Sequence, residues 1–200
     1  PLREQDWLNV FRMPDTVRPR TGFVGDVPVI GRHSRPQPGK WPTTREDILA
    51  AYPDSDDYRV EILGGAEVPE RTLGEVPAGW NVLPFGAEHP REFVERVDFW
   101  VYFHHPDLRE AFGRAAMEAL AGGAVVLLPT YLRELFGDAA LYGTPRDVLP
   151  LIDELYGDKD RFLAQSAKGR DFVRRFGPGE HLARLAELGI DLSSGRRAQG

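Results

Sequence analysis

EAFGRAAMEALAGG, at residues 110–123, is followed directly by the apolar run AVVLL at residues 124–128. The stretch joins an acidic residue, a tight Phe-Gly turn, a short amphipathic helix with a second acid, and a Gly-Gly stop. Such a turn leaves backbone N–H groups free at the start of the helix, where they can bind a phosphate or another anion. The two flanking carboxylates are poor phosphate ligands, but they accept hydrogen bonds well from hydroxyl groups. A ligand that carries both phosphate and hydroxyl groups, such as a nucleotide sugar, would suit this stretch.

The rest of the chain alternates short apolar runs with helical patterns, which is typical of a parallel α/β sheet. Strands are predicted at residues 27–32, 58–63, 80–84, 98–103, 124–128 and 139–142. Helices are predicted within the opening stretch and at residues 43–52, 89–97, 132–136, 146–156, 160–176 and 181–188. We therefore expect one α/β domain at residues 23–190, with a linker or interdomain segment at residues 1–22 and a disordered tail at residues 191–200.

The composition excludes several classes of protein. A 200-residue chain with 42% hydrophobic residues, four Trp and eleven Phe can bury a sizeable core. It has no cysteine, so it offers neither disulfides nor thiolate chemistry, and nothing argues for secretion. No apolar run approaches the length of a membrane span and no signal peptide is evident, so we expect a cytoplasmic protein. A net charge of −6 argues against a general nucleic-acid binder. Because the chain begins with Pro rather than Met, we expect a piece of a longer protein or a trimmed one.

Positive charge gathers in one part of this acidic chain. Residues 12–40 hold six basic side chains against two acidic ones. Three of the six lie in the loop GRHSRPQPGKWP at residues 31–42. This loop follows the first predicted strand, at the edge of the sheet where ligands bind in open parallel sheets. The loop lacks the dinucleotide fingerprint GxGxxG. It also fails the P-loop pattern, because Trp41 follows Lys40 where Ser or Thr is needed, and Ser34 occupies the first glycine position. The loop either binds a small anion in some other way or carries basic side chains that are merely solvated.

Residues 110–128 resemble the E-x7-E signature of retaining glycosyltransferases of group 1 with the GT-B fold, which use nucleotide-activated sugars. The usual form of the signature is E-G-F-G-x-x-x-x-E-A-x-A-x-G, followed by an apolar strand. The residues in register are Glu110, Phe112, Gly113, Glu118, Ala119, Ala121 and Gly123, with Ala111 in place of the first glycine. The order of strands and helices over residues 27–188 resembles the donor-binding half of these enzymes. The resemblance implies a Rossmann-like open parallel sheet with flanking helices, the C-terminal half of a GT-B fold.

The resemblance also implies how the chain would bind a donor diphosphate. In the family, the Arg and Lys of a Gly-Arg…Lys-Gly loop clamp the diphosphate, and Arg32 and Lys40 match them as catalytic residues. Here the loop is longer and richer in proline, and Trp41 stands where glycine is common, so Arg35 could share or replace one role. A transfer without a metal needs such fixed positive charge, together with N–H dipoles, to neutralise the leaving group.

The helix start and the two acids complete the implied donor site. The backbone N–H groups of Phe112, Gly113 and Arg114 are expected to donate to phosphate. In the family the first acid binds sugar hydroxyls and the second binds the nucleotide ribose, and these roles fall to Glu110 and Glu118. A rise of 1.5 Å per residue places Glu118 about 7 or 8 Å deeper along the helix, which suits this division. The alternatives are a helix-dipole partner for Glu110 and a surface charge for Glu118.

Other strand ends supply the remaining candidates. The family holds the nucleotide base near the strand end at residues 82–85, where Phe85 would either stack on the base or belong to the core. His104 and His105 follow the strand at residues 98–103, and we assign His105 as a donor contact, with a polar loop as the alternative. His33 is similarly ambiguous. His-His-Pro-Asp matches no metal motif of recognised spacing, so we expect neither a metal nor a cofactor.

These observations predict the donor-binding half of a retaining, metal-independent glycosyltransferase. It would move a hexose from a UDP- or GDP-like nucleotide sugar to an acceptor hydroxyl. The expected partner is the missing N-terminal, acceptor-binding domain, through which any membrane contact would occur, and no nucleic acid is expected. Two alternatives remain open: a nucleotide-sugar epimerase or phosphorylase relative with the GT-B fold, and a degenerate, non-catalytic nucleotide-sugar-binding module.

Overall fold

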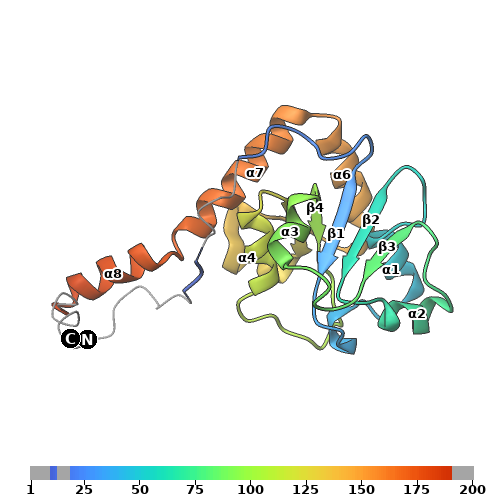
Figure 1. The fold of residues 1–200 in the computed structure, drawn as a ribbon, viewed down its shortest axis with the longest axis horizontal. Coiled ribbons are helices and arrows are strands. Elements are labelled where there is room, and N and C mark those ends of the chain that lie inside the picture. The colour runs from blue at the N-terminus through green and yellow to red at the C-terminus, as the bar shows by residue number, and fades with distance from the viewer. Residues whose placement is uncertain (1–9, 13–18, 191–200) are drawn as a thin grey trace.

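The structure, a computed structural model, describes residues 10–12 and 19–190. Six strands form one parallel sheet in the order β3-β2-β1-β4-β5-β6, with helices on both faces (Figure 1). This confirms the predicted class, a Rossmann-like α/β fold with an open parallel sheet. The tail predicted at residues 191–200 lies outside the described residues, as does most of the linker predicted at residues 1–22.

All six predicted strands are present. They are β1 Val29–His33, β2 Arg59–Leu63, β3 Trp80–Leu83, β4 Phe99–Val101, β5 Val125–Pro129 and β6 Leu141–Gly143. Successive side chains enter opposite cores: Val125 and Leu127 pack on one face of the sheet, and Val126 and Leu128 pack on the other. Because both faces are covered, the strands read as continuous apolar runs.

The α-helices of the described residues are α1 Arg45–Ala51, α2 Glu67–Leu73, α3 Pro90–Glu95, α4 Arg114–Ala121, α5 Arg133–Phe136, α6 Val148–Tyr156, α7 Lys159–Arg174 and α8 Pro178–Glu187. Helices α3 and α4 cover one face of the sheet, while α1, α2 and α6 cover the other. Helix α7 reaches both cores, through Phe162 near its start and Phe172 near its end.

Helix α2 was not predicted. Its sequence EVPERTL buries only Pro69 and Leu73, so the apolar pattern is weak. Proline is nevertheless tolerated in the first turn, because the N–H groups there have no intrahelical partner. The sequence pattern therefore failed where a short helix carries little of the core.

The sheet has a topological switch point between β1 and β4, which pair through Ile30 with Phe99 and Gly31 with Trp100. The chain leaves β1 toward β2 on one side and leaves β4 toward β5 on the other. In open α/β sheets the loops diverge at such a point and leave a crevice for ligands. Gly31 permits the close packing beneath this crevice, since a Cβ there would lie 2.3 Å from Cγ2 of Val97.

Candidate functional site

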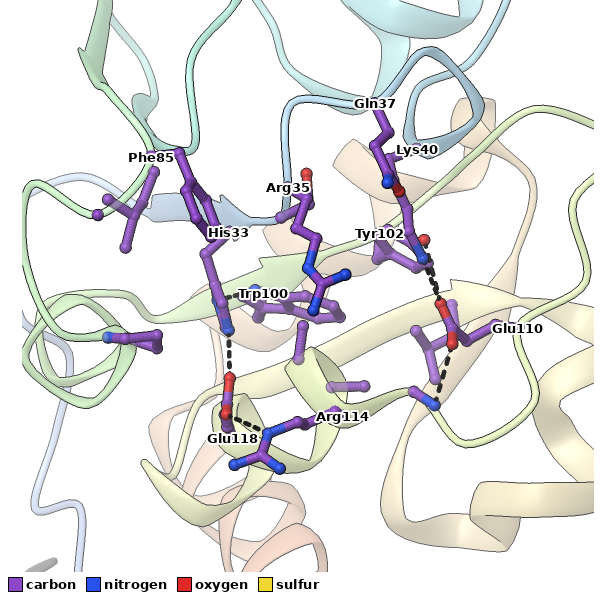
Figure 2. A pocket seen from close by; sticks show the side chains of 18 of the residues that line it. His33, Arg35, Gln37, Lys40, Phe85, Trp100, Tyr102, Glu110, Arg114 and Glu118 are labelled. Atoms are coloured by element: carbon purple, nitrogen blue, oxygen red, sulfur yellow. Dashed lines mark hydrogen bonds and ion pairs between the residues drawn. The ribbon is translucent and has the colours of Figure 1, made fainter.

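A cavity of about 500 Å³ lies at this switch point, lined by the loops that follow β1, β3 and β4 and by the start of α4 (Figure 2). Its size is that of an ordinary small-molecule site. Seven residues predicted from the sequence line it: Arg35, Lys40, Phe85, Glu110, Gly113, Arg114 and Glu118. Three predicted residues do not line it: Arg32, His105 and Phe112.

Glu110 lies at one end of the cavity in an ion pair with Lys40. The Lys40 Nζ donates to Oε2 of Glu110 at 2.8 Å, and the Tyr102 hydroxyl donates to the same oxygen at 3.4 Å. The backbone N–H of Gly113 donates to Oε1 at 3.4 Å. Burial raises the pKa of Glu110, but the hydrogen bond and charge of Lys40, with the Gly113 N–H and the Tyr102 hydroxyl, outweigh it and lower the pKa of this carboxyl.

The lowered pKa of Glu110 predicts an acid-sensitive contribution to stability. A carboxyl whose pKa is lower in the folded state stabilises the fold above its ordinary value of 4.5, and this stabilisation is lost as the pH falls through the folded pKa. We expect Glu110→Gln to lose less free energy of unfolding than the wild type between about pH 6 and pH 3, measured by urea denaturation. Glu180→Gln, at an exposed position of α8, is the control. An equally steep decline in Glu110→Gln would contradict the assignment.

Glu118 lies at the other end of the cavity, between two donors. The His33 Nε2 lies 3.0 Å from Oε2 of Glu118, and Nε of Arg114 donates to Oε1 at 3.1 Å. Burial raises the pKa of Glu118, but the hydrogen bond of His33 and the hydrogen bond and charge of Arg114 outweigh it and lower the pKa. The indole N–H of Trp100 in turn donates to Nδ1 of His33 at 3.0 Å. Sequence reasoning left His33 ambiguous and did not select Trp100. The available signal for His33 was its place at the end of a central strand, whereas Trp100 lies in the middle of its strand and gave no signal.

The start of α4 lies between the two acids. Gly113 precedes the helix in a left-handed conformation, with φ 68° and ψ 50°, and no side chain caps the helix. The first N–H groups of an α-helix have no intrahelical partner, and they carry the positive end of the helix dipole. Arg35 points into the same space, between His33 and Lys40 (Figure 2). Within the described part of the chain its guanidinium has no hydrogen bond or ion pair.

Arg32, predicted as part of the clamp, does not reach the cavity. It is fully buried, with its guanidinium 3.7 Å from the ring centroid of Trp41. Its Nη2 donates to the Lys40 carbonyl oxygen at 2.5 Å and to Oγ of Ser34 at 3.2 Å. The physical reason is strand alternation: β1 continues through His33, so that Arg32 and His33 point to opposite faces of the sheet. The sequence prediction ended this strand one residue too early.

The side chains of His105 and Phe112 also lie outside the cavity. The Nδ1 of His105 accepts from the N–H of Asp107 at 3.1 Å, in a surface turn. The partly buried Phe112 ring packs against the core, with its centroid 6.0 Å from that of Phe176, while the role expected of its backbone N–H stays a prediction. Phe85, by contrast, is 62% exposed beside the cavity, so its alternative assignment to the core is wrong.

The neighbouring residue His104 supports the loop that carries Glu110. Its Nδ1 lies 2.8 Å from the carbonyl oxygen of His105 and therefore carries a proton, which leaves Nε2 to accept from the Tyr131 hydroxyl at 2.7 Å. The Tyr131 oxygen accepts from the backbone N–H of Glu110 at 3.0 Å. Burial lowers the pKa of His104, which favours this neutral form. These hydrogen bonds thus fix the backbone of the loop that carries Glu110.

Residues 10–12 and 19–190 contain no group of three or more His, Asp or Glu side chains arranged to hold a metal ion. Over the same residues no helix has both the length and the apolar character needed to cross a membrane.

Comparison with solved structures shows the fold family. HepE of Anabaena, solved with UDP and glucose, matches with a TM-score of 0.64 and 19% identity over 82% of this chain and 48% of its own. A glycosyltransferase of Rickettsia africae matches with a TM-score of 0.62 and 15% identity, over 82% of this chain and 47% of its own. TarM of S. aureus, in a complex that includes UDP, matches with a TM-score of 0.60 and 15% identity, over 94% of this chain and 41% of its own. No protein-family profile and no curated protein matches the sequence.

The chain therefore has the fold of the C-terminal, Rossmann-like half of GT-B glycosyltransferases, as the sequence predicted. It spans about half the length of the HepE chain.

Proposed function

We propose that this chain is the nucleotide-sugar-binding half of a retaining, metal-independent glycosyltransferase that transfers a hexose to an acceptor hydroxyl. The observation that carries the proposal is the arrangement of Glu110 and Glu118 at the two ends of one cavity, with the start of α4 between them. The retaining mechanism rests on the resemblance of residues 110–123 to the E-x7-E signature. The complexes of HepE with UDP and with UDP-glucose favour a UDP-linked donor.

In this proposal the cavity stabilises the leaving nucleoside diphosphate. Lys40, Arg35 and the N–H groups at the start of α4 supply fixed positive charge where negative charge develops as the bond to the sugar breaks. Arg35 takes the role that the family motif gave to Arg32. Lys40 is paired with Glu110, so a bound diphosphate would compete for the Lys40 ammonium group and release Glu110 to accept from sugar hydroxyls.

The ribose and the base of the nucleotide would bind toward the Glu118 end of the cavity. Glu118 accepts from the ribose hydroxyls, and Phe85 offers an exposed ring to the base. In this proposal the acceptor would bind to a second, N-terminal domain. Positioning two substrates is worth many kcal/mol of the barrier, so we propose that this chain binds the donor without glycosylating an acceptor.

The two acids give the test of this proposal. Glu118→Ala should weaken UDP and UDP-glucose alike by about ten- to a hundredfold, because a hydrogen bond to a charged group is worth roughly 1.5–3 kcal/mol. Glu110→Ala should weaken UDP-glucose by a similar factor while leaving UDP nearly unchanged. Calorimetric titration of each variant with both ligands, in the presence of a chelator, measures the four affinities. Glu180→Ala, at an exposed position of α8, is the control.

The result can go against the proposal in three ways. Equal losses for both ligands in Glu110→Ala would mean that the acids are misassigned. A requirement for added Mg²⁺ or Mn²⁺ would exclude the metal-independent clamp. Acceptor turnover by the 200-residue chain alone would contradict its assignment as one half of the enzyme.

A further inference from the structure

Trp100, His33 and Glu118 form a linear relay of hydrogen bonds into the cavity. The Trp100 Nε1 lies 3.0 Å from Nδ1 of His33, and Nε2 of His33 lies 3.0 Å from Oε2 of Glu118. An indole N–H can only donate, so Nδ1 of His33 must accept. The ring proton then lies on Nε2 and is donated to Glu118. The relay therefore defines one neutral tautomer of His33.

Burial holds the first two members of this relay in place. Trp100 is 1% exposed and His33 is 5% exposed, and Phe93 packs against the imidazole with centroids 5.7 Å apart. The imidazole thus has little freedom to turn. The other donor to Glu118 is different in kind, because the Arg114 side chain is 77% exposed. Exposed i,i+4 ion pairs contribute little, so the orientation of Glu118 depends mainly on His33.

The direction of the relay determines what Glu118 can recognise. His33 delivers one N–H to Oε2, and a carboxylate oxygen has further capacity to accept. Glu118 can therefore accept further hydrogen bonds, and the hydroxyl groups of a ligand can donate them. A ligand that offers two neighbouring hydroxyls at this position would be recognised by an acid that is already oriented, without the cost of ordering it.

We propose that His33 and Trp100 are positioning residues that orient Glu118 and so make this end of the cavity selective for ribonucleotides over 2′-deoxyribonucleotides. This inference rests on the proposed function, since it assumes that the nucleotide ribose lies at Glu118. Neither residue needs to touch the base or the phosphates. Their effect is confined to the ribose hydroxyls.

The test compares UDP, 2′-deoxy-UDP and inorganic pyrophosphate by calorimetry. The wild type should prefer UDP over 2′-deoxy-UDP by about tenfold, the value of one hydrogen bond to a charged group. In His33→Ala and Trp100→Phe the preference should fall to about threefold or less, while the affinity for pyrophosphate, which has no ribose, stays unchanged. His33→Gln, which restores an N–H donor, should recover part of the preference.

A second readout does not need a ligand. Nitrogen-15 NMR of the histidine rings should show His33 as the Nε2–H tautomer in the wild type and a mixture of tautomers in Trp100→Phe. Trp80→Phe is the matched control, since it removes an indole N–H that donates instead to the Pro53 carbonyl oxygen at 3.0 Å. It should change neither the tautomer nor the nucleotide preference.

The outcomes separate this inference from the proposed function. If the wild type binds UDP and Glu118→Ala weakens it, but His33→Ala keeps the full ribose preference, the positioning role is overturned and the proposed function stands. An Nδ1–H tautomer of His33 would likewise overturn the relay. If the wild type binds neither nucleotide, the proposed function fails and the ribose assignment fails with it.

Discussion

Replacing Arg35 and Lys40 together with alanine is expected to weaken UDP binding by roughly a hundredfold or more. Each side chain would lose a charge-assisted contact with phosphate worth roughly 1.5–3 kcal/mol, and tenfold in affinity corresponds to about 1.4 kcal/mol. The loss of Lys40 has a second consequence, because it leaves Glu110 without its 2.8 Å partner. An unpaired carboxylate beside the phosphate site would repel the ligand further.

Calorimetric titration at two salt concentrations measures this effect. The wild type should lose affinity as salt increases, whereas the double variant should depend on salt much less, because its fixed positive charges are gone. Arg59→Ala is the control, since Arg59 is exposed at the opposite end of its strand from the cavity. A double variant that binds UDP within about threefold of the wild type would show that the phosphates lie elsewhere.

The second large effect concerns stability: Arg32→Ala is expected to lower the free energy of unfolding by about 3–5 kcal/mol. The substitution removes a fully buried side chain from its contact with Trp41 and leaves a cavity. It also leaves the part-buried carbonyl oxygen of Lys40 without its donor, which adds to the loss. Arg32→Met should be milder, because the thioether side chain refills most of the space.

Urea denaturation of both variants gives these free energies, and UDP titration of the same samples gives the comparison. If Arg32 orders the loop, both variants should be destabilised, and the loss of affinity should follow the loss of stability. If Arg32 were itself a phosphate ligand, both variants would lose UDP affinity tenfold or more with little change in stability. The second pattern would contradict the observed geometry, in which Arg32 contacts the Trp41 ring and the Lys40 carbonyl oxygen and does not line the cavity.

The fold could be predicted largely because a parallel sheet covered on both faces has a simple signature. Buried strands such as β5 are apolar throughout, and the glycines at residues 122 and 123 mark the end of α4. Helix α2 escaped prediction because only two of its side chains are buried. The end of β1 was predicted less well: the strand continues to His33, one residue beyond the predicted end, so that Arg32 is buried on one face of the sheet and His33, whose role was left open, lines the cavity.

The candidate site could be predicted only in part. Glu110, Gly113 and Glu118 belong to one short stretch, so their joint placement follows from local spacing. The partners of these residues come from distant segments: Lys40 and His33 follow or end β1, and Trp100 lies in β4. No local pattern identifies such pairs, because the pairing of the strands brings them together.

The same separation along the chain has a consequence for folding. The contacts of Lys40 with Glu110 and of His33 with Glu118 span 70 and 85 residues. The entropy of closing a large loop opposes contacts of such long range until other structure brings the segments together. The cavity therefore exists only once β1 and β4 are paired, so a ligand bound in it would stabilise the completed sheet rather than a partly paired one.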